Sequence, residues 1–138
     1  MADRGIHLTR LLLITLLVLS SGPAYAEWVE VVSSRGNGGY TVYANTDFNR
    51  RTGDVVKWWE MFDYKTVQTS KGISRLSTKI LSEYDCGEGR FRMLTLTHFT
   101  GNMGSGEMAF TGSGESKWEP VEPDSVGETM WKLVCSKP

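Results

Sequence analysis

Several residue types are scarce in this chain, and their scarcity excludes classes of function. Its 138 residues include only two cysteines, and these lie far apart, so the C-x-x-C motif of redox proteins is absent. Lysines and arginines number 15 against 16 aspartates and glutamates, so no long-range positive field favours nucleic acid or an anionic membrane. No linker, low-complexity tract or repeat divides the chain. These absences favour one ordinary globular domain.

The longest apolar run is short and lies near the start of the chain. It covers Leu11 to Leu19, interrupted only by Thr15, and precedes Gly22-Pro23 and the small-residue site Ala24-Tyr25-Ala26. This order is typical of a secretory signal peptide, and the run is shorter than the roughly 20 residues of a transmembrane helix. We expect cleavage of residues 1–26 rather than a retained membrane anchor. The remaining residues 27–138 would form one domain.

Cleavage changes the charge of the chain only slightly. Removal of Arg4, Arg10 and Asp3 takes the 15 basic and 16 acidic residues to 13 and 15, a net charge of −2. The mature chain of about 112 residues can bury a modest core. Because no cysteine lies near the cleavage site, we expect no lipid anchor, and we expect a soluble protein of the periplasm or the cell exterior.

Both cysteines, Cys86 and Cys135, lie beyond the predicted signal peptide. An even pair in an oxidising compartment predicts a disulfide. Closing a loop of about 50 residues would stabilise the fold by about 4 kcal/mol in the chain-entropy model. The alternative is a free reactive thiol, which the spacing of the two cysteines does not favour.

Alternating β-branched, aromatic and polar residues predict about six antiparallel strands. The predicted strands cover 27–33, 40–44, 55–62, 75–85, 90–100 and 107–111, with turns at 35–39, 52–54, 87–89 and 101–106. The polar stretch 66–74 contains a glycine and is interpreted as a loop. Within 90–100 the apolar positions change face partway along, which a twist, a bulge or a strand passing from an edge into a covered region would produce.

The end of the chain predicts a helix. Ser125-Val126-Gly127-Glu128 has the pattern of a capping box, and the apolar residues beyond it recur at helical spacing as far as Cys135. The chain is therefore predicted to be a mainly β (α+β) domain, a single antiparallel sheet with one C-terminal helix tied by the disulfide. The spacing leaves open whether the sheet closes into a barrel.

No set of residues marks an active site. His98 is the one histidine left after cleavage, and a Ser-His-Asp set would need a serine that no motif marks. The acidic groups Glu83 with Asp85, and Glu119 with Glu122 and Asp124, are interpreted as solvated charges rather than acid and base pairs. The glycine cluster at 101–106 lacks the Lys-Ser or Lys-Thr of a phosphate-binding loop. We expect no catalytic residues, no metal and no cofactor, and the protein is predicted not to be an enzyme.

Several short motifs together resemble the surface-adhesin protein E family of exported bacterial domains. The motifs are Tyr84-Asp85-Cys86, Arg90-Phe91-Arg92, Met103-Gly104-Ser105-Gly106, Trp118-x-Pro120-Val121, Pro123-x-Ser125 and Trp131-Lys132-x-x-Cys135, with Tyr40, Val42, Tyr43, Trp58 and Asp63-Tyr64-Lys65 before them. The resemblance implies a compact β domain with a C-terminal helix and a disulfide. It also implies binding of host extracellular matrix and related host proteins, and it leaves a homodimer open.

Six residues are candidates for partner binding, because aromatic residues and arginine are the usual interface anchors. They are Arg90, Arg92, Trp58, Trp59, Asn102 and Met103. The two tryptophans are adjacent on one strand and must point to opposite faces, so at least one lies on the less buried side. The competing expectation is that at least one of them belongs to the core. Two other hypotheses stay open. One is a periplasmic interaction module, either a hydrolase inhibitor or a receptor for a small apolar ligand, and the other is an envelope scaffold without a ligand.

Overall fold

In the part of the chain that the structure describes, alternating side chains form seven strands, and one α-helix follows them. A computed structural model of the protein describes residues 28–114 and 116–136, and the predicted signal peptide lies outside them. The strands are β1 (Trp28–Ser34), β2 (Tyr40–Thr52), β3 (Val55–Ser70), β4 (Ile73–Asp85), β5 (Arg90–Phe99), β6 (Met108–Ser113) and β7 (Glu119–Pro120). The helix is α2 (Val126–Ser136), and two 3-10 turns are η1 (Gly36–Gly38) and η2 (Asn102–Gly104).

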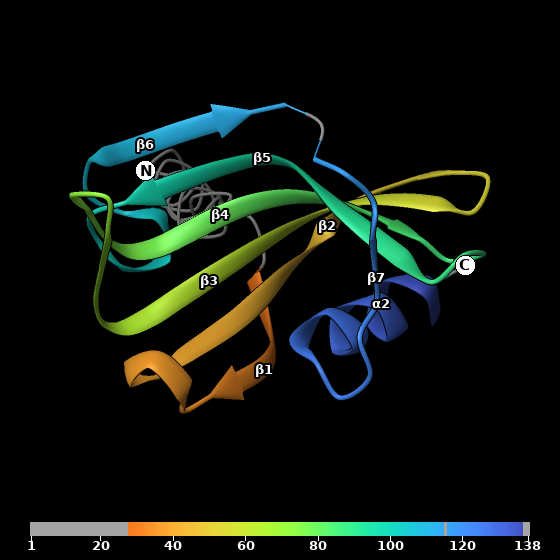
Figure 1. The fold of residues 1–138 in the computed structure, drawn as a ribbon, viewed down its shortest axis with the longest axis horizontal. Helices are drawn as coiled ribbons and strands as arrows, with labels where there is room; N and C mark the ends of the chain where they lie inside the picture. The colour runs from red at the N-terminus through yellow and green to blue at the C-terminus, as the bar shows by residue number, and fades with distance from the viewer. Residues whose placement is uncertain (1–27, 115, 137–138) are drawn as a thin grey trace, which may run out of the picture.

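The sheet is an antiparallel meander in which each strand pairs with the next one in the chain. Its order is β1-β2-β3-β4-β5-β6, and β7 pairs separately with the beginning of β5. Figure 1 shows the strands in this order, with α2 crossing one side of the sheet. The sheet does not close into a barrel, a point that the spacing of the sequence left undecided. The predicted mainly β fold with one C-terminal helix is confirmed.

The loop predicted at 66–74 is wrong. β3 continues to Ser70 and β4 begins at Ile73, and only Lys71 and Gly72 connect them. Both connecting residues have positive φ, of 51° and 76°, which is the backbone of a two-residue type I′ hairpin. The stretch is polar because this hairpin extends beyond the core, where neither face of the strands needs apolar side chains.

The change of face predicted within 90–100 is a β-bulge. Leu81 pairs with Thr95 and its neighbour Ser82 pairs with Met93, so Leu94 is the extra residue on β5. A bulge shifts the alternation of side chains by one position. The apolar residues on either side of the bulge can therefore lie on one face of the sheet.

The helix begins as its sequence predicts. The Ser125 hydroxyl accepts the backbone N–H of Glu128 at 3.1 Å. The Glu128 carboxylate reaches back to the backbone N–H of Asp124 at 3.5 Å, one residue earlier than in a standard capping box. The first of these bonds satisfies one of the N–H groups that a helix start leaves without partners.

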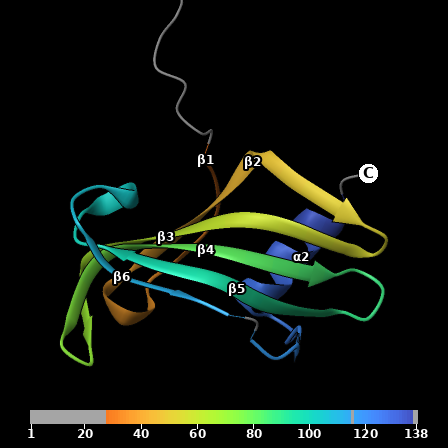
Figure 2. The same ribbon diagram turned by 90° about the horizontal axis from the view of Figure 1, so that it is seen from above.

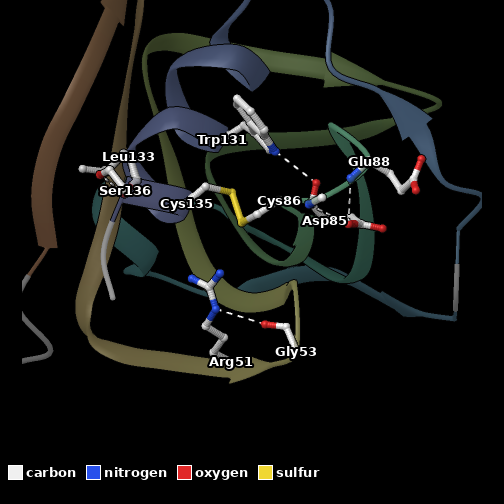
Figure 3. The surroundings of a disulfide bond; sticks show 10 residues. Arg51, Gly53, Asp85, Cys86, Glu88, Trp131, Leu133, Cys135 and Ser136 are labelled. Carbon is white, nitrogen blue, oxygen red and sulfur yellow. Dashed lines mark hydrogen bonds between the residues drawn. A yellow bond between two sulfur atoms is a disulfide. The ribbon is translucent and has the colours of Figure 1, made fainter.

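The disulfide joins α2 to the end of β4. Cys86 and Cys135 are bonded, with their Cα atoms 5.6 Å apart, as the sequence predicts. The indole N–H of Trp131, one turn earlier on α2, donates to the backbone oxygen of Asp85 at 3.1 Å (Figure 3). The covalent and polar contacts thus hold the helix at one end of the sheet.

The core lies between α2 and one face of the sheet. Its fully buried members are Val42, Ala44, Val56, Trp58, Tyr84, Met130 and Val134. From β3 these are the even-numbered residues, which alternation places on a single face. Figure 2 shows α2 behind β3, β4 and β5, with η2 at the other end of the sheet.

Candidate protein-binding surface

The sheet face turned away from α2 carries five of the six candidate binding residues. We call it the outer face and define it by the odd-numbered residues 57–63 of β3 and 77–85 of β4, by Arg90 and Arg92 of β5, and by the side chains that lie on them. Register supports this grouping, since Lys57 pairs with Glu83 and Glu83 pairs with Arg92. The core residues of the same strands lie on the opposite face.

Two arginines and one tryptophan form the most distinctive cluster on the outer face. The guanidinium carbons of Arg90 and Arg92 lie 4.7 Å and 4.3 Å from the ring centroid of Trp118. These distances are those of cation–π contacts. We call these three residues the arginine–tryptophan cluster. Trp118 is half-buried, and the Arg90 side chain is 43% exposed.

The segment before β7 holds Trp118 in place. Ser116 acts as a strand partner for Met93, because its hydroxyl accepts the Met93 N–H and donates to the Met93 carbonyl, both at 2.9 Å. On the other side, Glu119 and Pro120 pair with the first residues of β5. Trp118 lies between these two anchors and therefore has a defined position over the arginines.

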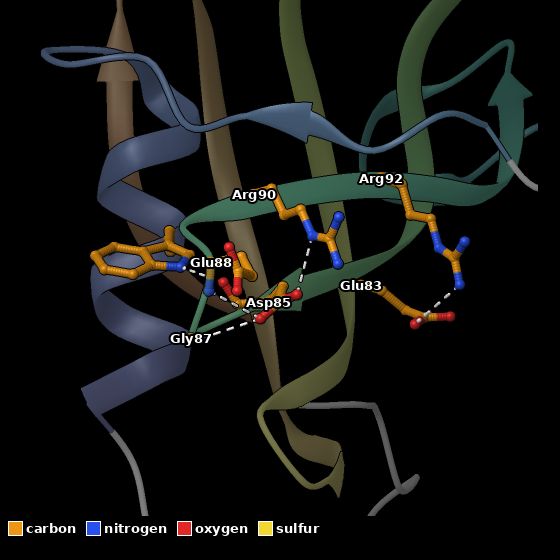
Figure 4. Close-up of polar contacts among 7 residues, drawn as sticks. Glu83, Asp85, Gly87, Glu88, Arg90 and Arg92 are labelled. Atoms are coloured by element: carbon orange, nitrogen blue, oxygen red, sulfur yellow. Dashed lines mark hydrogen bonds and ion pairs between the residues drawn. The ribbon is translucent and has the colours of Figure 1, made fainter.

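Acidic residues on β4 orient both arginines (Figure 4). The Asp85 carboxylate accepts from Arg90 Nε at 3.0 Å, and Glu83 lies 3.6 Å from Arg92. Asp85 also accepts the backbone N–H groups of Gly87 and Glu88, each at 3.1 Å. The bond from Glu88, followed by the contact with Arg90, lowers the pKa of Asp85. The acidic pair Glu83 and Asp85 is thus in ion pairs, not in the solvated state predicted for it.

A tryptophan and a lysine occupy the middle of the outer face. Trp59 is half-buried, and the Lys79 ammonium lies 4.4 Å from its ring centroid. Trp58, by contrast, is 0% exposed and belongs to the core with α2. The prediction of Trp58 as a partner-binding residue is corrected, because its side chain points to the helix. The expectation that one of the two tryptophans is core is confirmed.

The turn η2 caps the far end of the outer face. The Asn102 amide donates to Asp63 Oδ1 at 3.1 Å and to the Tyr64 carbonyl at 2.9 Å. The Met103 N–H donates to the same carboxylate at 2.8 Å, and Met103 is 39% exposed with φ of 53°. Ser77 joins the turn to β4, since its hydroxyl donates to the Gly101 carbonyl at 2.6 Å. The turn is therefore fixed to the sheet and presents an apolar side chain to solvent.

His98 lies on the other face and is engaged structurally. Its Nδ1 is 2.8 Å from the Thr78 hydroxyl, and its ring lies 5.7 Å from that of Phe110. Burial, and then the positive charge of Arg75, lower its pKa. Within 28–114 and 116–136, no group of three His, Cys, Asp or Glu side chains could hold a metal ion. The same residues contain no helix that is both long and apolar enough to span a membrane.

Sequence reasoning missed two members of this surface, Trp118 and Lys79. Trp118 belongs to one of the short motifs, but no residue near it in the sequence predicts that a two-residue strand brings it over β5. Lys79 is one of several lysines, and only the pairing of β3 with β4 places it beside Trp59. Both positions depend on pairing between residues that are distant in the sequence, which no local pattern predicts.

Comparison with known proteins gives a family match and a fold match. The family model described as "Surface-adhesin protein E" matches residues 28–136. No sequence among curated proteins matches the chain. Crystal form II of Haemophilus influenzae protein E superposes with a TM-score of 0.61 at 10% identity, over 83% of this chain and 91% of that chain. Another structure of the same protein superposes with a TM-score of 0.60 at 10% identity, over 83% of this chain and 87% of that chain.

Proposed function

The chain belongs to the surface-adhesin protein E family, and from that premise we propose that it is an exported, non-enzymatic, adhesin-like protein that binds a protein partner through its outer face. The partner class suggested by the family is a host extracellular matrix protein. Likeness of fold at 10% identity supports the scaffold alone, so the location of the binding surface is argued from this chain's own residues.

The observation that carries the proposal is the arginine–tryptophan cluster. Arginine and tryptophan are the residue types most enriched among interface hot spots. Here Asp85 and Glu83 fix the guanidinium groups, and Trp118 stacks against both of them. Side chains that are already ordered lose less conformational entropy when a partner binds. The cluster is therefore suited to binding a protein without rearrangement.

The outer face has the dimensions of a standard interface. From Asp85, beside the cluster, to Ser77, beside η2, β4 extends over about 26 Å at roughly 3.3 Å per residue. A typical partner buries about 800 Å² on each side, a patch of similar width. The Trp59–Lys79 pair lies between the two ends. One partner could thus contact Trp59, Arg90, Arg92, Asn102 and Met103 together.

The proposal is tested first by direct binding. Mature protein, produced by export and cleavage in bacteria, is passed over immobilised laminin, fibronectin and fibrillar collagen in a biosensor, with serum albumin as the control surface. We expect saturable binding to at least one matrix protein and none to albumin. Binding to none of the three, with the protein folded by circular dichroism, would remove the adhesin proposal.

Display at the cell surface is tested separately. We propose export through the signal peptide with cleavage before Glu27, so the intact mass of envelope-derived protein should begin at that residue. Antibody labelling of intact cells should then detect the domain outside the outer membrane. Labelling only after the outer membrane is permeabilised would place the protein in the periplasm and favour the interaction-module hypothesis. The mass of the purified protein in solution tests the homodimer.

A further inference from the structure

A cavity of about 160 Å³ lies between α2 and the sheet, on the opposite face from the outer face. Its apolar walls are Phe62, Ile80, Phe91, Met93, Val126 and Met130. An engineered protein cavity of about 150 Å³ is known to bind benzene, so this cavity can hold one aromatic ring or a short branched chain. The two methionines make its walls adaptable, because a thioether side chain has several low-energy conformers.

One acidic group faces this apolar cavity. Glu60 is 4% exposed, and its carboxylate accepts a hydrogen bond from the Tyr84 hydroxyl. On the neighbouring strands, Glu60 pairs with Ala44 and Ile80. From α2, Met130 lines the same cavity. All three of these side chains are uncharged. Burial raises the pKa of Glu60 to about 7, and Tyr84 is the one described group that acts against that rise. A carboxyl in such surroundings is costly and suggests a use.

A second hollow beside the cavity is also lined by acidic residues. It measures about 420 Å³ and shares Phe91, Val126 and Gly127 with the cavity. Its wall includes Glu119 and Glu122. Among the described residues that line either space there is no lysine, arginine or histidine. The local charge is therefore negative, which disfavours anions and attracts cations.

We propose that the cavity binds a small primary amine with an aromatic or branched apolar body. The body occupies the space between Phe62, Phe91 and Met130, and the ammonium group donates to the Glu60 carboxylate. Tyr84 continues to donate to Glu60, so the carboxylate stays satisfied on both sides. The acidic hollow guides the cation toward the entrance. This site is independent of partner binding on the outer face.

The wild-type protein gives the first test, with three ligands of one shape. Benzylamine, benzyl alcohol and benzoate are titrated into the mature protein at pH 8 and pH 5.5, with methionine methyl signals recorded by NMR. We expect benzylamine to shift Met93 and Met130 but not the exposed Met108. Its affinity should fall at least tenfold at pH 5.5, because the Glu60 carboxyl is then protonated. Equal binding of the three ligands, or no shift of Met93 and Met130, would overturn the proposal.

Two variants test which residues make the site. Glu60→Gln keeps the shape but removes the charge, and it should weaken benzylamine binding at pH 8 at least tenfold while leaving benzyl alcohol unchanged. Gly127→Leu should block both ligands, because even a Cβ added at this position would lie 3.5 Å from the Phe91 ring. Glu107→Gln, an exposed acid at the other end of the sheet, is the matched control. If Glu60→Gln folds and binds benzylamine as tightly as the wild type, the proposal is contradicted. If Glu60→Gln does not fold, unchanged benzylamine affinity in Gly127→Leu contradicts it instead.

Discussion

At the residue scale, Asp85 links the fold to the proposed binding surface. At the end of β4 its carboxylate accepts the backbone N–H groups of Gly87 and Glu88. The same carboxylate accepts from Arg90 and so orients the guanidinium group that contacts Trp118. These bonds favour the ionised form and lower its pKa. A group with a lowered folded pKa stabilises the fold above its unfolded pKa and loses that contribution as pH falls.

Asp85→Asn should therefore lower the melting temperature at pH 7. The amide keeps one acceptor but not the charge, so the bonds to Gly87, Glu88 and Arg90 all weaken. The difference from wild type should shrink as the pH falls below about 4, the ordinary pKa of an aspartate, toward the lower pKa of the folded Asp85 carboxyl. Thermal scans by circular dichroism between pH 2 and pH 8 measure this. A difference that is constant across the range would show that ionisation of Asp85 does not contribute.

Glu60 has the opposite effect on stability. Burial raises its pKa from the usual 4.5 to about 7, so the folded state keeps a proton that the unfolded state releases. Stability should fall as pH rises from about 4.5 to 7 and then level off. Glu60→Gln should remove this loss and be more stable than wild type at pH 8, by on the order of 3 kcal/mol at most.

Urea unfolding of both proteins at a series of pH values checks this prediction. The difference between wild type and Glu60→Gln isolates Glu60, because His98, with its lowered pKa, contributes in both proteins and in the opposite direction. Glu107→Gln serves as the exposed control and should follow the wild type. A difference curve without slope between pH 4.5 and 7 would mean that Glu60 is ionised in the folded protein.

At the scale of elements, α2 depends on the disulfide for its position. The helix has 11 residues, too few to be stable alone in water, and it covers only one end of the sheet. The double variant Cys86→Ser/Cys135→Ser should lose about 4 kcal/mol of unfolding free energy in the chain-entropy model. Amide exchange should quicken most in α2, because the bond that ties it to β4 is gone.

Reduction of the wild-type protein gives an independent check of that prediction. Unfolding with and without a reductant should reproduce the loss seen in the double variant. An unchanged melting temperature in both would mean that the packing of Met130 and Val134, with the Trp131–Asp85 hydrogen bond, holds the helix without the disulfide.

The elements also show where sequence patterns are informative. Strands 55–62 and 75–85 and the C-terminal helix were predictable, since apolar alternation and the Ser125 capping pattern are local. The hairpin at 66–74 was not, because a polar segment outside the core has no apolar alternation to reveal a strand. β7 has two residues and contains a proline, so pairing with β5, not propensity, makes it a strand.

At the scale of the whole molecule, the two faces of one sheet carry different kinds of residue. One face packs against α2, forms the core and contains the cavity with Glu60. The outer face carries the polar and aromatic residues that we assign to partner binding. Five of the six candidate residues could be nominated singly from residue type. Their gathering on one face could not, because it depends on the strand register and on the folding of η2 onto Ser77 and Asp63.

The affinity of matched variants for the bound matrix protein tests the central claim most directly. Trp118→Ala removes the ring that both Arg90 and Arg92 contact, and a hot-spot residue of this kind contributes about 2 kcal/mol or more. Lys132→Gln is the control, since Lys132 lies on α2 and is 67% exposed. We predict that Trp118→Ala weakens binding at least tenfold with an unchanged circular dichroism spectrum, while Lys132→Gln binds as wild type. Equal affinity of Trp118→Ala and wild type, or an equal loss in Lys132→Gln, would contradict binding through the outer face.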